Sequence, residues 1–100
     1  MTTLESKADK DATVVRIAEI VASKAPARLR TVLGSCIGVA LYDRRAGIGG
    51  LAHVMLPDSR GEVKMPGKFA DTAIPALVEK LTQAGAGKLS AKIAGGANML

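Results

Sequence analysis

Hydrophobic and polar residues are arranged along residues 36–56 in a way that predicts two neighbouring β-strands. Residues 36–43 (CIGVALYD) are apolar at both alternating positions, which favours a strand covered on both faces. A polar connection, Asp43–Gly47, ends in glycine, and residues 48–56 (IGGLAHVML) return as a second strand. The pattern therefore predicts an antiparallel hairpin centred near Arg45.

The clearest helix is predicted for residues 69–84. Asp71 lies near its start and Gly85 directly after its end, as is typical of helix termini. Pro75 is unfavourable, because a proline beyond the first turn removes a backbone hydrogen bond. The apolar residues at helical spacing are Phe69, Ala73, Ala76, Leu77 and Leu81.

Weaker signals cover the segments on either side. Residues 13–22 (TVVRIAEIVA) fit either a strand or a short helix, and a turn is expected at residues 23–26, where Pro26 restricts the residue before it. Short strands are predicted for residues 28–33 and 90–94. The first of these is broken by the glycine and serine that follow it.

Two polar regions have no regular pattern. Residues 57–67 (PDSRGEVKMPG) form a loop rich in glycine and proline, and loops of this length in small domains are often functional. Residues 1–12 are polar and charged and are predicted to be a flexible leader, which leaves residues 13–100 as the domain. Gly95-Gly96 favours a tight turn.

The amino-acid composition indicates in which cellular compartment the protein is expected. The chain has 100 residues, enough for one domain, and is 48% hydrophobic, which is ordinary for a globular protein. Its single cysteine cannot form an intrachain disulfide, which is typical of a reducing compartment. No apolar run approaches the ~20 residues of a membrane-spanning helix. We therefore expect a cytoplasmic protein without membrane insertion.

Charge suggests a protein partner more than a nucleic acid. The formal net charge is +5, and much of the basic excess lies in Arg28, Arg30, Arg44 and Arg45. Only two aromatic residues are present, whereas proteins that bind single strands stack bases on aromatic side chains. The composition thus argues against nucleic acid and favours an acidic protein surface.

Cys36 is the first candidate for chemistry. Free cysteine most often packs as a small buried hydrophobe, and this is the alternative reading of Cys36. The preceding Gly34 and Ser35 change the picture, because a residue without a side chain permits close approach of a ligand. Backbone N–H groups near Cys36 could then face a developing oxyanion.

The only histidine, His53, lies on the returning strand. With the turn centred near Arg45, Cys36 and His53 would lie opposite each other, with Cβ atoms about 5 Å apart. An imidazole beside a thiol favours the reactive thiolate. A structural histidine is the alternative, and a slip of one residue would turn His53 to the other face.

A third residue would orient the imidazole, and the pattern alone does not choose among the candidates, which are Thr31, Ser35, Asp58 and Ser59. Metal chemistry is disfavoured, because one cysteine and one histidine cannot supply the four ligands of a structural zinc site. We expect neither a metal nor another cofactor.

Four motifs in the same order resemble those of the CheD family, over about residues 29–100. The first is the nucleophile segment and the second contains the histidine; a helix start and a glycine-rich turn follow. They are residues 31–36 (TVLGSC) with 39–43 (VALYD), 48–57 (IGGLAHVMLP), 68–75 (KFADTAIP) and 91–99 (AKIAGGANM).

This resemblance implies a site and an activity. Cys36 matches the family nucleophile, His53 the family histidine, and Thr31 is the threonine available upstream of the cysteine. The family deamidates glutamines on chemoreceptors, and some members also hydrolyse glutamyl methyl esters. Gly34 and Ser35 would support the oxyanion through their backbone, and Asp58 and Ser59 belong to the loop expected to meet the substrate.

The resemblance also implies a fold and partners. The fold expected is α+β, with helices packed outside layered β-sheets, as in cysteine hydrolases related to bacterial deamidating toxins. The expected partners are the cytoplasmic helices of chemoreceptors and the phosphatase CheC. Family members are usually longer, so the domain is expected to be incomplete at its C-terminus. A non-catalytic fragment that binds CheC or a receptor is the alternative function.

Overall fold

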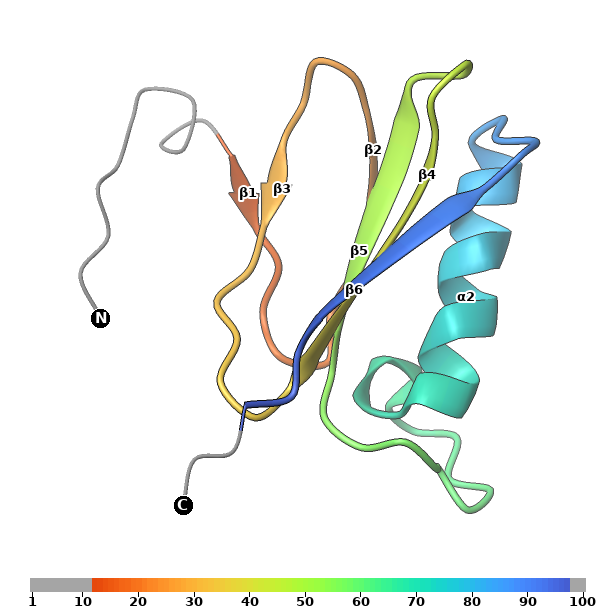
Figure 1. The fold of residues 1–100 in the computed structure, drawn as a ribbon. Helices are drawn as coiled ribbons and strands as arrows, with labels where there is room; N and C mark the ends of the chain where they lie inside the picture. Colours follow the sequence, from red (N-terminus) through yellow and green to blue (C-terminus); the bar gives the residue numbers. More distant parts are fainter. Residues whose placement is uncertain (1–11, 98–100) are drawn as a thin grey trace.

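The computed structural model describes residues 12–97, and a four-stranded antiparallel sheet lies at their centre (Figure 1). Its strands follow the order β2 (Ile20–Lys24), β5 (Ile48–Val54), β4 (Ile37–Asp43) and β6 (Ser90–Gly95). The leader predicted for residues 1–12 lies, up to residue 11, outside the described residues.

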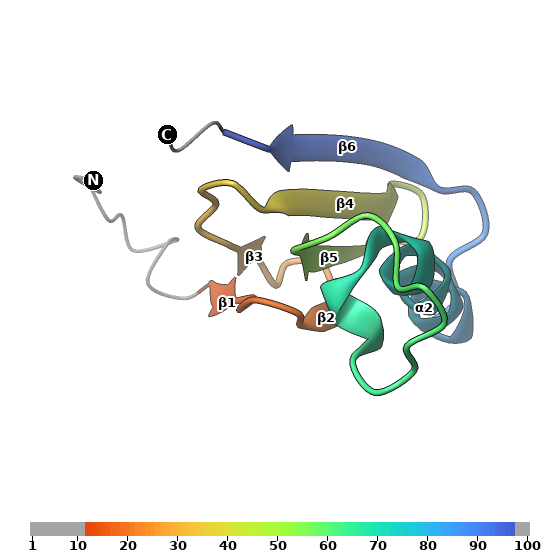
Figure 2. The same cartoon turned by 90° about the horizontal axis from the view of Figure 1, so that it is seen from below.

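Two smaller layers flank this sheet on opposite sides, and the two views agree on this (Figures 1 and 2). On one side lies the helix α2 (Ala70–Gln83), preceded by a single 3-10 turn, η1 (Pro66–Lys68). On the other side, β1 (Thr13–Val14) pairs in parallel with β3 (Leu29–Arg30). The described part of the chain is thus sheet-rich with one α-helix, in agreement with the coarse α+β expectation.

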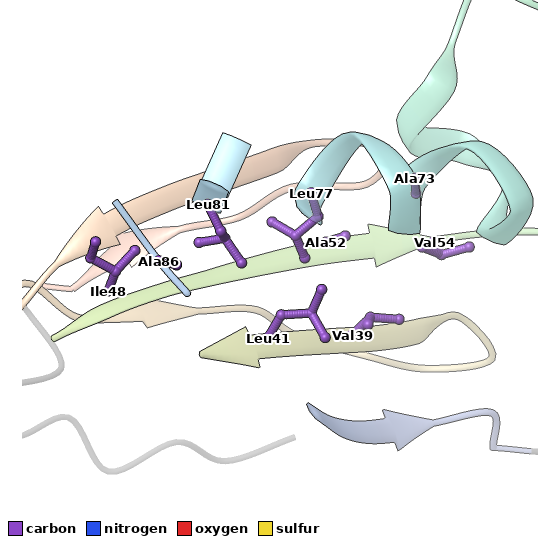
Figure 3. Close-up of a cluster of buried hydrophobic side chains, with 9 residues drawn as sticks. All are labelled: Val39, Leu41, Ile48, Ala52, Val54, Ala73, Leu77, Leu81 and Ala86. Atoms are coloured by element: carbon purple, nitrogen blue, oxygen red, sulfur yellow. The ribbon is translucent and has the colours of Figure 1, made fainter. Parts of the chain in front are cut away.

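The hydrophobic core lies between α2 and the sheet (Figure 3). Leu77 and Leu81 of α2 are fully buried and point toward β5, where they meet Ala52. Burying one leucine side chain contributes about 1.5–3 kcal/mol, so this layer is a main source of stability. The remaining members of the cluster are Val39, Leu41, Ile48, Val54, Ala73 and Ala86.

The hairpin between β4 and β5 turns through residues 44–47, and Asp43 pairs with Ile48 at its base. Asp43 Oδ1 accepts hydrogen bonds from the N–H groups of Arg45 at 3.0 Å and Ala46 at 3.1 Å, as aspartate often does in turns. Gly47 closes the turn with a φ of 67°, which glycine adopts without steric cost. The hairpin prediction is confirmed, but the centre of the turn lies one residue later than expected.

The buried Asp43 carboxylate also ties this turn to the loop between α2 and β6. Its Oδ2 accepts the N–H groups of Gly87 at 2.7 Å and Lys88 at 3.2 Å. The pKa of Asp43 is lowered from its ordinary value, chiefly by the hydrogen bond from Gly87 and then by that from Ala46, while burial opposes the shift. The ionised carboxylate therefore joins two segments distant in sequence.

The other predicted elements are confirmed in part. The helix expected over residues 69–84 is α2, with Ala73, Leu77 and Leu81 on its buried face. Residues 13–22, left open between strand and helix, contain β1, a turn and the start of β2. The strand expected at 28–33 shrinks to β3, because the chain leaves extended pairing after Arg30.

The expectation that β4 is covered on both faces is only half met. Val39 and Leu41 are buried against the α2 side, whereas Ala40 and Tyr42 on the other face are half-buried. The short β1–β3 layer covers that face incompletely. Within residues 12–97, no helix is long and apolar enough to cross a lipid bilayer.

Candidate functional site

His53 lies near the end of β5, on the sheet face turned away from α2, and only 4% of its surface is exposed. Its backbone is held by the turn that leads into β2: the His53 N–H donates to Glu19 O at 3.2 Å, and the Ala18 N–H donates to His53 O at 2.8 Å. A buried imidazole needs partners for its ring nitrogens. These two backbone hydrogen bonds therefore hold the main chain of His53 in place independently of its side chain.

Thr31 supplies the ring partner. Its Oγ1 lies 2.8 Å from His53 Nδ1, and the same hydroxyl donates to the Val15 carbonyl at 2.6 Å. Because a hydroxyl has a single proton, and that proton is directed at Val15 O, the oxygen is left to accept from Nδ1–H. In the neutral ring this hydrogen bond corresponds to the tautomer with the proton on Nδ1 and the lone pair on Nε2.

The pair β1–β3 puts Thr31 and the Val15 carbonyl together. The Val15 N–H donates to Arg30 O at 2.7 Å, and the Thr13 N–H donates to Arg28 O at 2.9 Å. These bonds align the end of β1 with the residue that follows β3. Of the four candidates for the third residue, Thr31 is the one that contacts His53.

The predicted pairing of Cys36 with His53 is wrong. Gly38 lies opposite His53, and Ile37 opposite Val54 is the last pair of this part of the ladder. The reason is the hairpin turn: residues 44–47 form it, so every cross-strand partner is shifted by two residues from the expected pairing. Cys36 lies one residue before β4, and no hydrogen bond joins its side chain to His53 in the described part of the chain.

Gly38 leaves space on the face that His53 shares. A Cβ on Gly38 would lie 3.0 Å from Leu33 Cδ1 and 3.7 Å from Thr31 Cγ2, so the segment before Cys36 folds over this glycine. Thr31, the loop that carries Cys36 and His53 therefore belong to the same side of the sheet. Cys36 is partly exposed, so a ligand can reach this residue.

The loop Gly34–Cys36 is held through its carbonyl groups. Gly96 N–H donates to Cys36 O at 2.9 Å, and Ala97 N–H donates to Gly34 O at 3.2 Å. Between residues 12 and 97, no acceptor is bonded to the N–H of Ser35 or Cys36. Donors without a protein partner beside a thiol are what an oxyanion requires.

A cavity of about 390 Å³ lies beside the Thr31–His53 pair. Its rim carries three exposed apolar side chains, Val14, Ile17 and Val32. The other lining residues are Val15 and Arg16 together with the pair itself. Cys36 does not line this cavity. The imidazole of His53 therefore borders a cavity formed mainly by β1 and the residues that follow it.

Asp58 and Ser59 form hydrogen bonds that stabilise the loop of residues 57–67. Ser59 is buried, and its Oγ donates to Asp71 Oδ2 at 2.8 Å while its N–H donates to Asp71 Oδ1 at 3.0 Å. Asp58 Oδ1 accepts the Arg60 N–H at 2.9 Å within a local turn. Both residues line a second cavity, of about 690 Å³, which neither Thr31 nor His53 borders.

Sequence reasoning missed three contributors to this site. The Val15 carbonyl is a backbone group, so no side-chain pattern could have indicated it. In the sequence, Gly38 is one residue of an apolar strand and carries no signal of its own. Gly95-Gly96 carried a visible signal, two adjacent glycines, but only the structure shows that they lie beside the Cys36 loop.

Comparison with known proteins identifies similar sequences. Residues 55–100 match the family model described as CheD chemotactic sensory transduction. A protein of Methanococcus vannielii named "Probable chemoreceptor glutamine deamidase CheD" is 54% identical over 88 residues, which cover 85% of this chain and 57% of that protein.

Two clostridial proteins with the same name are equally similar. That of Clostridium novyi is 55% identical over 96 residues, covering 91% of this chain and 59% of the relative. That of Clostridium botulinum strain Hall is 57% identical over 90 residues, covering 85% and 56%. The chain therefore spans somewhat more than half the length of the curated relatives it matches.

Proposed function

The chain belongs to the CheD family, and from this premise we propose that it deamidates glutamine side chains of chemoreceptors, with Cys36 as nucleophile and His53 as base. The reaction converts a glutamine amide into a glutamate carboxylate and releases ammonia. The relatives carry this activity in their names.

One observation carries the proposal: the hydrogen bonds that join Val15, Thr31 and His53. A general base must present a lone pair to the proton that it removes, and the second ring nitrogen must be held so that the correct tautomer is present. Thr31 does this at Nδ1. Among the described residues the second ring nitrogen, Nε2, has no hydrogen-bond partner, and Cys36 lies on the same side of the sheet as His53.

The proposed chemistry follows from these groups. His53 Nε2 accepts the proton of the Cys36 thiol, and the thiolate sulfur bonds to the amide carbon of the glutamine. The carbonyl oxygen becomes an oxyanion, which backbone N–H groups at Gly34–Cys36 stabilise. The imidazolium then protonates the departing nitrogen, so ammonia and a thioester result.

Water completes the cycle. Nε2 removes a proton from a water molecule, and the resulting hydroxide attacks the thioester carbon. The carbon–sulfur bond breaks, glutamate is formed and Cys36 recovers its proton. A glutamyl methyl ester would react by the same steps with methanol as the leaving group, so the proposal includes methyl ester hydrolysis.

The partners and location proposed are those of the family. They are the cytoplasmic helices of chemoreceptors and the phosphatase CheC, in the cytoplasm. The loop of residues 57–67 would meet the receptor, with Asp58 and Ser59 holding its shape through bonds to Arg60 N–H and Asp71. The alternative is a fragment that binds CheC or a receptor without catalysis, favoured by the absence of a Cys36–His53 hydrogen bond among the described residues.

Deamidation of a receptor cytoplasmic fragment tests the proposal. The chain is incubated with the fragment, and peptides are analysed by mass spectrometry for glutamine converted to glutamate. We expect conversion with the native chain and none with Cys36→Ala or Cys36→Ser, because neither variant supplies a thiolate. His53→Gln should also abolish it.

The matched control is Ser35→Ala, which keeps every backbone group of the loop and should remain active. Circular dichroism establishes that each variant is folded. A folded native chain that converts no glutamine but binds the receptor fragment would establish the non-catalytic alternative. Conversion that persists in Cys36→Ala would remove the nucleophile assignment.

A further inference from the structure

The end of β6 follows the backbone of the Cys36 loop beyond the regular sheet. Ile37 of β4 pairs with Gly95, the last residue of β6. After this pair the two chains stay together, through the bonds of the Gly96 and Ala97 N–H groups to the carbonyls of Cys36 and Gly34. β6 thus pairs with β4, and the two residues that follow β6 contact the nucleophile loop.

Positive φ values at two consecutive residues make this path possible. Gly95 has a φ of 103° and Gly96 a φ of 76°, conformations that residues with a side chain rarely adopt. A Cβ at residue 95 would overlap the Cys36 carbonyl oxygen and lie 3.2 Å from Leu33 Cδ1. Glycine at position 95 is therefore required both by its backbone conformation and by its contact with the nucleophile.

The hydrogen bond between Ala97 N–H and Gly34 C=O also determines the direction of the next N–H group, because the peptide bond is planar. In a trans peptide the C=O and the following N–H point in opposite directions. Since Gly34 C=O points at the N–H of Ala97, two residues after β6, the Ser35 N–H points away from this segment. That N–H has no partner among the described residues, so it is a donor free to meet a ligand.

We propose that Gly95 and Gly96 are positioning residues for the nucleophile loop: they hold its carbonyl groups so that Cys36 stays in place and the Ser35 N–H is aimed at the oxyanion. This inference rests on the proposed function, which supplies the oxyanion. It assigns to a glycine pair at the far end of the sequence a role that its local pattern does not indicate.

The decisive comparison is between Gly95→Ala and Gly85→Ala. Gly85 has a similar φ of 110°, but a Cβ there would meet only Ile48 Cδ1, at 3.7 Å. Both variants should lose thermal stability because both force alanine into a similar, rarely adopted backbone conformation, and Gly95→Ala should lose more because its Cβ also overlaps the Cys36 carbonyl oxygen. Only Gly95→Ala displaces the Cys36 carbonyl.

We expect Gly95→Ala to lower kcat for receptor-fragment deamidation by about 100-fold, the usual effect of losing one oxyanion donor, with KM unchanged. Gly85→Ala should keep the native kcat. Equal kcat in the two variants would overturn the proposal, as would a rise in KM that accounts for the whole loss.

A milder variant covers the case in which Gly95→Ala does not fold. In Gly96→Ala the added Cβ would lie 3.1 Å from Ile37 Cδ1, the end of a side chain that can move. Its kcat should fall between those of Gly85→Ala and Gly95→Ala. A kcat equal to that of Gly85→Ala would contradict a positioning role.

Alkylation separates this inference from the proposed function. The rate at which iodoacetamide modifies Cys36 is measured by mass spectrometry in the native chain and in the three variants, without any receptor. We expect a several-fold change in Gly95→Ala and the native rate in Gly85→Ala. If the native chain deamidates nothing, these rates still decide whether the glycine pair positions Cys36; identical rates in all four proteins would overturn the inference.

Discussion

The two faces of the four-stranded sheet differ in what covers them. Toward α2, the side chains are apolar and closely packed, with Ala52, Leu77 and Leu81 fully buried. Toward β1–β3, the sheet presents Gly38, half-buried residues and His53, under a layer only two residues long in each strand. One face excludes water, whereas the other leaves a cavity beside its histidine.

The two faces of the sheet therefore have separate roles: one stabilises the fold, and the other holds the polar residues of the candidate site. The face toward α2 contributes hydrophobic burial, and the buried carboxylate of Asp43 lies at the hairpin end of the sheet with four N–H partners. The opposite face can then hold a buried imidazole and threonine hydroxyl in a partly open setting. Changes on the first face should affect folding, and changes on the second should affect chemistry.

The largest effect on stability is expected from Leu77→Ala. Removing a fully buried leucine side chain leaves a cavity under α2 and should lower the free energy of unfolding by about 3 kcal/mol, measured by urea denaturation. Val78→Ala is the control on the same helix, because Val78 is 37% exposed. Its effect should stay within about 0.5 kcal/mol. Similar losses in both variants would mean that the helix face is not the main core.

Thr31→Val should have a large effect on the deamidation rate and a small effect on stability. It keeps a branched side chain but removes the hydroxyl that joins Val15 O to His53 Nδ1, so we expect kcat for deamidation to fall by about 100-fold. The free energy of unfolding should fall by only about 1–2 kcal/mol, the cost of unsatisfied buried partners.

Thr31→Ser is the matched control, because it restores the hydroxyl and should recover most of the rate. A serine variant as slow as the valine variant would show that the methyl group, and hence packing over Gly38, matters more than the hydrogen bonds.

The smallest effect is expected from Asp43→Asn, and it depends on pH. The folded-state pKa of Asp43 lies below its ordinary value of 3.8, so its stabilisation is complete above that value and is lost as the pH falls through the lower folded-state pKa. Urea denaturation at about pH 7 and about pH 3 should show a larger loss of stability for the native chain than for Asp43→Asn.

Asp58→Asn is the control for this experiment, because the Asp58 carboxylate accepts only the Arg60 N–H in an exposed turn. It should follow the native chain at both pH values. If Asp43→Asn and the native chain lose the same stability on acidification, the carboxylate does not hold the hairpin to the loop that precedes β6.

Local pattern was sufficient for the elements that repeat regularly. The helical spacing of Ala73, Leu77 and Leu81 predicted α2, and two apolar runs on either side of a polar turn predicted β4 and β5. These predictions succeeded because periodicity reports which face of an element is buried, whatever it packs against. Single residue types also pointed to candidates for chemistry: the one cysteine and the one histidine of the sequence.

Register was decided by the tertiary structure. The sequence placed the hairpin but not the centre of its turn, which lies one residue later than expected, and this shift brought Gly38, not Cys36, to the position opposite His53. The choice of Thr31 among four candidates depended on β1 pairing with β3, a contact between distant segments.

Residues close together along the chain were enough to predict α2, β4 and β5, the buried face of α2 and the side chains that are candidates for chemistry. Only the tertiary structure decided which groups meet: Val15 O with Thr31, and Gly96 with Cys36. These contacts involve backbone carbonyl and N–H groups, which every residue carries. A side-chain pattern cannot predict these contacts, because the groups that meet are distant in sequence and come together only in the folded chain.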